Sequence, residues 1–454
     1  MRPSKLRQIN LARFLILSLA ISSFATTISI FVFNGGFQQL GNLAAVLYAT
    51  TRLAALLATN LLLIHILLVA RVSWLESSFG HDRLVRTHKL LGKLILYLVL
   101  MHVIAAVSQF AIGSGASLID EFIVMVTFTP DLITAAFALG FMIVVVLTSL
   151  NISRKRVAYE VWHMLHLFAY AVVLLAMPHQ FSLGSDISRE DFATFYWLAL
   201  YFFVLSNIIW FRILKPLFRA VTSLLRVERV ERTSSDSVSI YLTSKDLKRY
   251  TAAAGQFFVF RPITANQWYK PHPFSMSAAS NPRHVRFTVA SRGDDTEQIQ
   301  SIKPGTVVLL EGPYGIFTES RRTQKDVVLV ASGIGIPPIR ALAESIAADP
   351  GDVTIIYRVR NENDAALLDE TRELARSRGF KLVIQAGNRA SANSWMNAGP
   401  EGSTDLERLL EIAPKLAESD VYVCGPAAWT KAVERTLKNA GTPTKQVHTE
   451  QYSW

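Results

Sequence analysis

Four histidines in the first 180 residues have a spacing that suits two stacked metal sites. His88 and His102 lie 14 residues apart in one apolar run, and His166 and His179 lie 13 residues apart in another. At about 1.5 Å per residue both separations are roughly 20 Å along a helix, so the two runs carry histidines at two matched depths. A haem held between two helices takes one imidazole from each helix at one depth. The pattern predicts two bis-histidine haems, and hydrogen bonding between neighbouring helices is the alternative.

The directions of these side chains give a second test. Fourteen residues at about 100° each leave the first two histidines only about 40° apart around their helix, on one face. Thirteen residues leave His166 and His179 about 140° apart, but Pro178 can distort that helix end and redirect the last side chain. His163, three residues before His166, is an alternative ligand.

The elements that carry these histidines are long and apolar. The chain has 454 residues, of which 51% are hydrophobic and 18% charged, with a mean hydropathy of +0.29. Soluble domains have about 25% charged residues, so the composition excludes a purely soluble protein and a disordered one. Six runs approach or exceed the roughly 20 residues that cross a bilayer, near residues 11–33, 43–70, 90–112, 122–149, 158–179 and 193–214. The first run is not followed by a clean signal-peptide cleavage site.

The net charge of +11 is concentrated in the apolar half. Residues 1–220 hold 17 Lys and Arg against 9 Asp and Glu, or +8, and the remainder holds 29 against 26, or +3. The basic residues precede the first run, separate the second from the third and the fourth from the fifth, and follow the sixth. This positive-inside pattern predicts a multi-pass protein of the cell (inner or plasma) membrane, set in the lipid bilayer with both termini cytoplasmic. The nearly balanced polar half argues against nucleic-acid binding.

Three further polar residues of the apolar half need an interpretation: Arg52, His65 and His81. Arg52 lies near the outer end of the second run. It either snorkels to the outer surface or supplies a cation near the outer haem, where it would pair a propionate or attract a reduced oxygen species. His65 and His81 have no partner at a matched depth, so we interpret His65 as a packing histidine and His81 as a loop residue.

The sequence pattern changes after Lys215, from long apolar runs to short β-rich ones. Short β-rich runs such as VSIYLTS and GQFFVFRPI, separated by Gly, Pro and Asn, predict an antiparallel β-barrel or sandwich of about 100 residues. From Asp326 strands alternate with helical segments, which predicts an open α/β sheet with parallel strands. The expected fold is an α-helical six-span membrane bundle (1–220), an antiparallel β-barrel domain (221–320) and an α/β nucleotide-binding domain (321–454).

A glycine-rich turn follows the first strand of the α/β segment. After VVLVAS come Gly333, Gly335 and Pro337 in a GxGxxP pattern. Glycines let the backbone approach a pyrophosphate, and the next helix offers its positive N-terminus to it. Arg358 and Arg360 end the second strand, where an arginine can pair a 2′-phosphate. This favours NADPH over NADH, and the alternative for the arginines is a solvated strand end.

With these features the chain resembles the ferric reductase and NADPH oxidase superfamily, particularly its compact bacterial members, over nearly its whole length. The His-Leu-Phe start on the fifth span of that family matches His166-Leu167-Phe168, and the second ligand thirteen residues on matches His179. Arg52 matches a family arginine near the oxygen-side haem. The resemblance implies two b-type haems bound on the third and fifth spans, then a flavin domain and a nicotinamide domain.

Two motifs of the β-rich segment resemble flavin-binding elements of ferredoxin reductase-like modules. In the HPFS run the aromatic residue would contact the flavin, and the hydroxyl would bond the ring near N5 and polarise the hydride acceptor. A loop that begins RGDDT would cradle the flavin phosphates with backbone amides. The GPYG turn then closes the FAD domain. The implied FAD-binding residues are His272, Pro273, Phe274, Ser275, Arg292 and Thr296.

The end of the chain carries the last implied site residues. Cys424, Gly425 and Pro426 match a turn that lies beside the nicotinamide in the family and assists hydride geometry. Cys424 is the only cysteine, which excludes a disulfide framework, a thiolate iron–sulfur cluster and a Cys-type zinc site. Trp454 matches an aromatic that stacks on the flavin until nicotinamide displaces it, although a frayed tail is the default for a terminus.

These features predict a transmembrane electron-transfer enzyme. NADPH would reduce FAD in the cytoplasm, and electrons would pass through an inner haem (His88, His166) and an outer haem (His102, His179). The outside acceptor is expected to be oxygen, which gives superoxide. A ferric-chelate reductase of the same architecture is the alternative. An alternative of another class is a non-enzymatic channel or transporter with a regulatory nucleotide-binding domain. The oligomeric state is left open.

Overall fold

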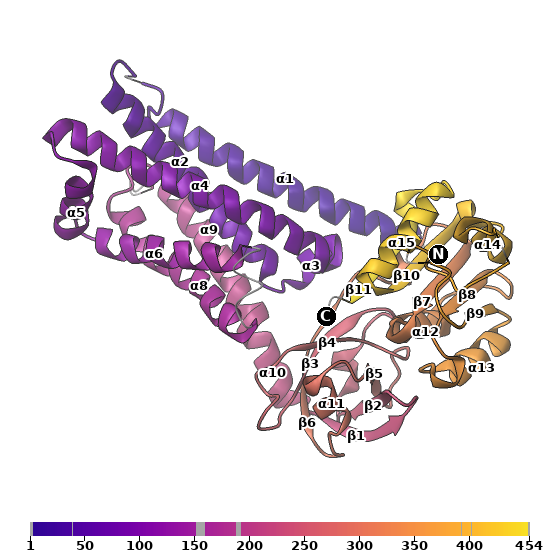
Figure 1. The fold of residues 1–454 in the computed structure, drawn as a ribbon. Helices are drawn as coiled ribbons and strands as arrows, with labels where there is room; N and C mark the ends of the chain where they lie inside the picture. Colours follow the sequence, from indigo (N-terminus) through magenta and orange to yellow (C-terminus); the bar gives the residue numbers. More distant parts are fainter. Residues whose placement is uncertain are drawn as a thin grey trace. The chain divides into compact units, whose positions relative to one another are not determined.

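The chain folds into two compact units, one of residues 10–214 and one made mainly of residues 215–454. This computed structural model describes residues 3–38, 40–150, 159–187, 192–391, 393–400 and 402–452. Figure 1 labels the helices and strands of both units, and each unit is described by itself below.

The first unit is a bundle of long apolar helices. Among the described residues, six helical spans are long and apolar enough to cross a membrane. The helices that carry them are α1 (Pro3–Phe33), α2 (Leu43–Val69), α4 (His81–Ser114), α6 (Leu132–Ser149), α8 (Tyr159–Ser182) and α9 (Phe192–Ile208). A π-helical turn (Ile209–Leu214) joins α9 to α10 (Lys215–Thr222), and α3 (Ser73–Phe79) is a short connection. Large apolar side chains such as Leu19, Phe128 and Phe202 are more than two thirds exposed, as expected of a surface that faces lipid.

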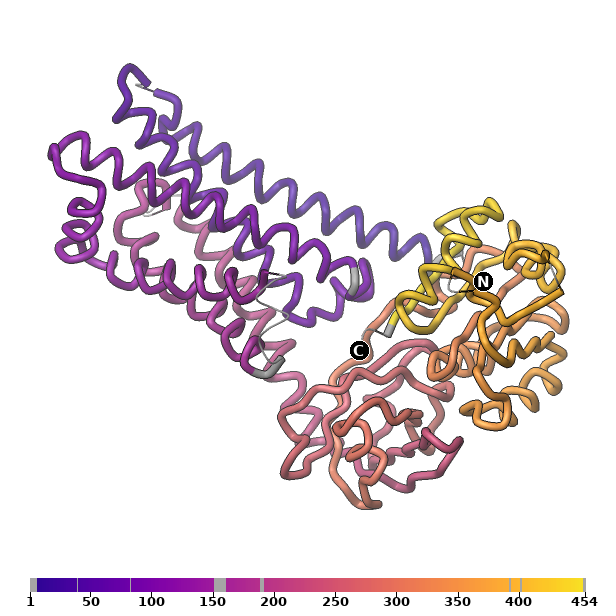
Figure 2. Tube along the Cα trace, viewed as in Figure 1, coloured from indigo at the N-terminus to yellow at the C-terminus, as the bar shows by residue number. Residues whose placement is uncertain are grey.

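Helices α2 and α4 run side by side, as do α6 and α8 (Figure 2). The two histidine-bearing helices are α4 and α8. The interior of the bundle is filled where α2, α4, α6 and α8 meet, around Leu61, Ile95, Met142 and Val172. This packing fixes the rotation of each helix, and so decides which histidines face one another.

The predicted fourth span differs in the structure. The run near 122–149 is two helices, α5 (Leu118–Phe128) and α6, and not one. Thr129, the residue before Pro130, is extended (φ −98°, ψ 126°), because the proline ring disfavours a helical conformation at the preceding residue. Asp131 then has a positive φ of 63°. The prediction that this run is helical and apolar is confirmed, but the prediction that it is one continuous helix is wrong.

His81 also differs from its prediction. It is the first residue of α4 and not a loop residue. Its Nδ1 lies 3.0 Å from Oε1 of Glu76, a buried carboxylate in α3, and Arg71 approaches the same oxygen at 3.8 Å. The helix therefore begins about nine residues before the apolar run that was used to locate the third span.

The second unit contains two sheets. The first is antiparallel with strand order β4-β3-β6-β1-β2-β5. Its strands are β1 (Leu225–Arg232), β2 (Ser237–Thr243), β3 (Phe257–Pro262), β4 (His272–Ser275), β5 (Val285–Ala290) and β6 (Val307–Tyr314), and α11 (Asp294–Gln300) follows β5. Phe258, Phe260 and Phe287 fill its interior.

The second sheet is parallel with strand order β11-β10-β7-β8-β9. The strands are β7 (Asp326–Ser332), β8 (Val353–Arg358), β9 (Lys381–Gln385), β10 (Ser419–Pro426) and β11 (Val447–Tyr452). Helices α12 (Ile336–Ser345) and α13 (Leu368–Arg378) cover one face, and α14 (Asp405–Ile412) and α15 (Ala427–Asn439) cover the other. The strand order reverses between β7 and β10, which is where open α/β sheets bind ligands.

The predicted fold class is confirmed: a six-span helical bundle is followed by an antiparallel sheet domain and an open α/β domain. The antiparallel strands lie within residues 221–320 and the parallel strands within 321–454. The domain boundaries themselves stay predictions.

Candidate dinucleotide, flavin and haem sites

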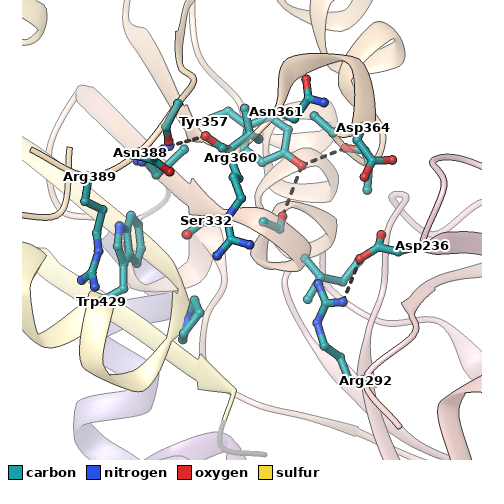
Figure 3. Close-up of a pocket in the computed structure, with 18 of the residues that line it drawn as sticks. Asp236, Arg292, Ser332, Tyr357, Arg360, Asn361, Asp364, Asn388, Arg389 and Trp429 are labelled. Carbon is teal, nitrogen blue, oxygen red and sulfur yellow. Dashed lines mark hydrogen bonds and ion pairs between the residues drawn. The ribbon is translucent and has the colours of Figure 1, made fainter. Parts of the chain in front are cut away.

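A cavity of about 750 Å³ opens at the carboxyl ends of the parallel strands. Its lining comes from the ends of β7, β8 and β10, from the loop after β9, and from two residues of the antiparallel domain. Figure 3 shows Arg360 and Ser332 near the middle of this cavity, with Asp236 and Arg292 facing them. The cavity therefore lies at the switch point of the sheet, where a dinucleotide is expected.

The GxGxxP turn is shaped for close backbone approach. Gly333 has a φ of +52°, and a Cβ on Gly335 would lie only 2.2 Å from the carbonyl oxygen of Cys424. The Tyr357 hydroxyl is shared between the carbonyls of Ala366 (3.0 Å) and Gly333 (3.2 Å), and so connects the turn to the segment before α13. Pro337 lies in the first turn of α12, where its missing N–H costs nothing. Glycine is thus required at both positions, one for conformation and one for space.

Arg358 is the last residue of β8, and its side chain binds backbone carbonyls. It is 6% exposed, and its guanidinium donates to the backbone carbonyls of Gln385 (2.8 Å) and Gly387 (2.6 Å) and to that of Val359. Burial, and then the positive charges of neighbouring arginines, lowers the pKa of Arg358 from its ordinary value. These bonds fix the loop after β9 and occupy much of the guanidinium of Arg358. Arg358 also lines the cavity, and its contact with a 2′-phosphate stays a prediction.

Two exposed arginines are better placed for an anion. Arg360 follows β8, Arg389 lies in the loop after β9, and both line the cavity. Sequence reasoning missed Arg389 because the loop after the third strand of this domain carries no motif. An asparagine-arginine pair at the carboxyl end of a parallel strand was the available signal.

The loop predicted to bind the flavin phosphates is closed by hydrogen bonds of Thr296, and its flavin contact stays a prediction. Thr296 Oγ1 accepts a hydrogen bond from the backbone N–H of Arg292 (2.7 Å) and donates to the carbonyl of Gly293 (2.8 Å), so it closes the loop on itself. The Arg292 side chain points to the dinucleotide cavity and pairs with Asp236 at 2.7 Å. Its position suits a nucleotide phosphate as well as a flavin phosphate.

The HPFS run forms β4, at the edge of the antiparallel sheet. The amide of Gln267 donates to Asp295 and Gln298, so its oxygen accepts from His272 Nε2 at 2.9 Å. Burial lowers the pKa of His272, which keeps the ring neutral. Pro273 is exposed, and the half-buried Phe274 packs on Phe260. The strand therefore presents a neutral, partly aromatic edge to a ligand.

Ser275 points to a residue that the sequence analysis did not select. Its hydroxyl donates to Oε1 of Glu450 at 3.0 Å. Glu450 lies on β11 in register with Cys424 on β10, so the carboxylate that binds Ser275 comes from the strand beside the Cys-Gly-Pro segment. The signal that could have found Glu450 is an acidic residue inside VHTEQY, the last β-rich run of the chain.

The Cys424–Gly425–Pro426 segment is buried at its first residue and reaches the cavity at its last. Cys424 is fully buried, which suits a positioning role. A Cβ on Gly425 would lie 2.7 Å from the ring of Trp429, and Pro426 lines the cavity. Trp454 lies outside the described residues, so its predicted stacking stays a prediction.

In the bundle, the structure brings His88 of α4 to His166 of α8. Their ring centroids are 6.0 Å apart. A metal ion between two imidazoles, with metal–nitrogen bonds of about 2 Å each, separates the ring centroids by roughly 6 Å. His163, the predicted alternative, lies one turn earlier beside Trp162, with ring centroids 6.4 Å apart. The geometry favours His166 as the partner of His88.

The hydrogen bonds of three histidines leave one nitrogen for a metal. His88 Nδ1–H donates to His65 O (3.2 Å), and His102 Nδ1–H donates to Thr51 O (3.0 Å). His166 Nδ1 bonds Ser149 Oγ at 3.1 Å; since that hydroxyl donates to a backbone carbonyl, it accepts here. With the proton on Nδ1, the lone pair is on Nε2, as metal-ligating histidines require.

The second histidine pair is less closely defined. His179 is within electrostatic range of His102, and α8 continues through Pro178 to Ser182. The Nδ1 atom of His179 is buried without a hydrogen-bond partner among the described residues. The residues present therefore fit a bis-histidine group at the first pair fully and at the second pair in part.

Arg52 does not have the role of an isolated cation. Its Nε and Nη2 bind both carboxylate oxygens of Asp186 at 2.7 and 2.6 Å, and Nη2 also donates to Asn34 O at 3.1 Å. Asp186 is only 3% exposed, and Phe31 and Tyr48 flank the guanidinium. The structure thus corrects the snorkelling reading, because Arg52 is neutralised inside the bundle. Its neighbour Thr51 supplies the carbonyl that holds His102.

Replacing Asp186 by asparagine is expected to destabilise the bundle by about 3–5 kcal/mol, since the variant leaves the Arg52 charge buried without a partner. Thermal unfolding in detergent measures the loss. The double variant D186N/R52M should recover most of the stability. Asp120→Asn, an exposed carboxylate, is the matched control. Equal loss in the single and double variants would contradict the ion-pair account.

Taken together, these sites define a class: a membrane-spanning oxidoreductase with a flavin and nicotinamide reductase module. Residues 54–177 match the family described as "Ferric reductase like transmembrane component", and residues 329–435 match "Oxidoreductase NAD-binding domain". This pair of matches confirms the resemblance to the ferric reductase and NADPH oxidase superfamily. The chain is an oxidoreductase, which removes the channel or transporter alternative.

The similar proteins match about half of this chain. The chain is 24% identical over 233 residues to a flavohemoprotein of Bacillus subtilis (strain 168), which covers 49% of this chain and 57% of that protein. It is 28% identical over 228 residues to a flavohemoprotein of Burkholderia sp. (strain TH2), covering 48% and 56%. The matches thus span just over half the length of these relatives.

Among solved structures, the FAD/NAD-binding domain of nitric oxide dioxygenase from Vibrio cholerae O1 biovar El Tor matches with a TM-score of 0.43 and 22% identity. That match covers 51% of this chain and 98% of the other.

Proposed function

We propose that this chain carries electrons from cytoplasmic NADPH, through FAD and two b-type haems, to oxygen on the other side of the membrane. The observation that carries the proposal is the His88–His166 pair, with 6.0 Å between rings and both Nδ1 atoms already hydrogen-bonded. One NADPH would give two electrons and one proton, and two oxygen molecules would each take one electron to become superoxide.

The chain's own residues account for the first step. A bound flavin would supply the conversion of a two-electron donor into one-electron steps, and haem iron would carry single electrons. The Gly333–Gly335 turn and α12 bind the pyrophosphate of the nicotinamide cofactor. Ser275 holds a proton on a hydroxyl oriented by Glu450. Cys424, which is fully buried beside this site, would help to position the nicotinamide.

The proposed electron acceptor is oxygen, and Arg52 bears on it less than the sequence suggested. Pairing with Asp186 removes the argument that Arg52 attracts a reduced oxygen species by its net charge. Bis-histidine ligation allows outer-sphere transfer at a haem edge to either acceptor. The preference for oxygen therefore rests on the short connection between α8 and α9, whose sequence offers no obvious site for a chelate. The second candidate is a ferric chelate, which the description of the matched transmembrane family favours.

The orientation is also part of the proposal. With both termini in the cytoplasm, the reductase module meets its NADPH there, and the His102–His179 pair lies toward the outside of the inner or plasma membrane. Protease or a membrane-impermeant biotin reagent applied to intact cells should spare the reductase module. Labelling of that module from outside would show that the proposed orientation is wrong.

The proposal is tested by spectroscopy of the purified full chain. We expect a low-spin b-type spectrum that NADPH reduces anaerobically, with two haems per chain. NADPH-driven cytochrome c reduction with and without superoxide dismutase then identifies the acceptor. Suppression by dismutase supports oxygen. Absence of any reducible Soret band overturns the haem proposal, and faster dismutase-insensitive turnover of ferric chelate overturns the oxidase.

The double variant R360A/R389A is expected to raise the KM for NADPH by roughly tenfold to hundredfold, the size of one or two lost hydrogen bonds between charged groups. The KM for NADH should change far less, because NADH has no 2′-phosphate. Steady-state kinetics with both cofactors measure the ratio. Arg376→Ala, an exposed arginine on α13, is the control. A parallel rise for both cofactors would remove these arginines from 2′-phosphate recognition.

A further inference from the structure

The ring of His65 lies flat on the ring of His88. The centroids of the two imidazoles are 3.7 Å apart and their planes differ by 9°. His65 comes from α2 and His88 from α4, the two helices that run side by side. His65 therefore packs against a neighbouring helix, as predicted, but the prediction that it has no partner at a matched depth is wrong, because it stacks on His88 of the first ligand pair.

Two reciprocal hydrogen bonds join these histidines. His65 Nε2–H donates to the carbonyl oxygen of His88 at 3.0 Å, and His88 Nδ1–H donates to the carbonyl oxygen of His65 at 3.2 Å. Each ring is therefore held by the backbone of the other residue as well as by stacking. The arrangement fixes the tautomer and the rotation of His88, with its Nε2 directed away from α2.

Gly92 leaves the space that this arrangement needs. It lies one turn after His88 on α4, and a Cβ there would come within 3.2 Å of His65 Nε2. A glycine inside a helix costs about 1 kcal/mol relative to alanine. Contact with a neighbouring side chain gives a physical reason for glycine at this position. By contrast, a Cβ on Gly140, inside α6, would meet nothing within 4 Å.

We infer that His65 is a positioning residue for His88 that sets the reduction potential of the haem held by His88 and His166. The inference rests on the proposed function. A hydrogen bond from Nδ1–H to a carbonyl raises the basicity of a ligating imidazole, and such bonds tune the potential of the iron. Loss of the His65 ring would free His88 to rotate, weaken that bond and so disfavour the oxidised form.

The test is a potentiometric titration of the full chain, wild type against His65→Leu and His65→Phe, with low-spin electron paramagnetic resonance of each. Leucine removes both the stack and the donor, whereas phenylalanine keeps a flat ring. We expect the midpoint of one haem to rise in His65→Leu, with a smaller rise in His65→Phe, and the resonance of that haem alone to change. The other haem is the internal control.

A matched pair of glycine variants tests the same contact without touching a histidine. Gly92→Ala, which crowds His65, should shift the same haem as His65→Leu, and Gly140→Ala should shift neither. Unchanged midpoints and resonances in both His65 variants, or equal movement of both haems, would overturn the inference. Loss of both haems in all His65 variants would do so too, since it indicates packing alone. A wild type without haem would instead refute the proposed function.

Discussion

Replacing His166 by leucine is expected to remove one of two haems and to abolish transmembrane electron transfer. The variant takes one imidazole from the pair whose rings lie 6.0 Å apart. Loss of a residue that only supports a metal ligand lowers metal affinity or activity by about 10–100-fold. Loss of the ligand itself should therefore lower haem affinity by more than about 100-fold. Haem content by pyridine haemochrome and NADPH-driven reduction of an outside acceptor measure the two effects.

The reductase module supplies the control for this variant. Reduction of FAD by NADPH should be unchanged in H166L, because Ser275 and Glu450 lie in the other unit. A second control is His163→Leu, one turn earlier on α8, which should retain both haems. If H163L loses haem and H166L does not, the ligand assignment is wrong.

Replacing Glu450 by glutamine is expected to slow reduction of FAD by NADPH by about 10²–10⁴-fold, the usual contribution of a positioned acid or base. Glu450 accepts the hydrogen bond of Ser275 and stands in register with Cys424. Glutamine keeps the shape but loses the charge that orients the hydroxyl. Anaerobic stopped-flow of flavin absorbance measures the step directly, without the haems.

The controls separate chemistry from folding. Ser275→Ala should show a loss of similar size, and the double variant should be little slower than either single one, because the two residues act as a unit. Glu373→Gln, on the exposed face of α13, should have no effect. Additive losses in S275A and E450Q, or an unchanged rate in E450Q, would contradict a coupled pair. The haem spectrum should stay that of the wild type.

Pattern and spacing predicted the elements of this protein well, because they depend on local properties. Apolar run length located the spans, and the change to a period of two residues located the antiparallel strands. Local reasoning failed where the chain breaks without a change of hydropathy. Thr129 and Pro130 interrupt an apolar run that hydropathy treats as continuous. Helix α4 likewise extends to His81 through polar residues that hydropathy excludes.

The candidate site was predictable where one motif carries it and not where several elements meet. Gly333 and Gly335 are two residues apart in the sequence, and they form a tight turn after β7. Strand position alone did not show that the guanidinium of Arg358, which lines the cavity, also donates to the carbonyls of Gln385 and Gly387. Glu450 was missed because its partner Ser275 is 175 residues away.

The sequence by itself determined that the chain spans a membrane and ends in a nucleotide-binding α/β domain, since hydrophobic run length and glycine placement act within a few residues. The flavin domain was implied by the resemblance of its motifs to a known family. Only the tertiary structure decided the pairings: His88 with His166 and His65, and Arg52 with Asp186. The reason is that helix periodicity specifies a face of one helix. The packing of neighbouring helices decides what that face meets.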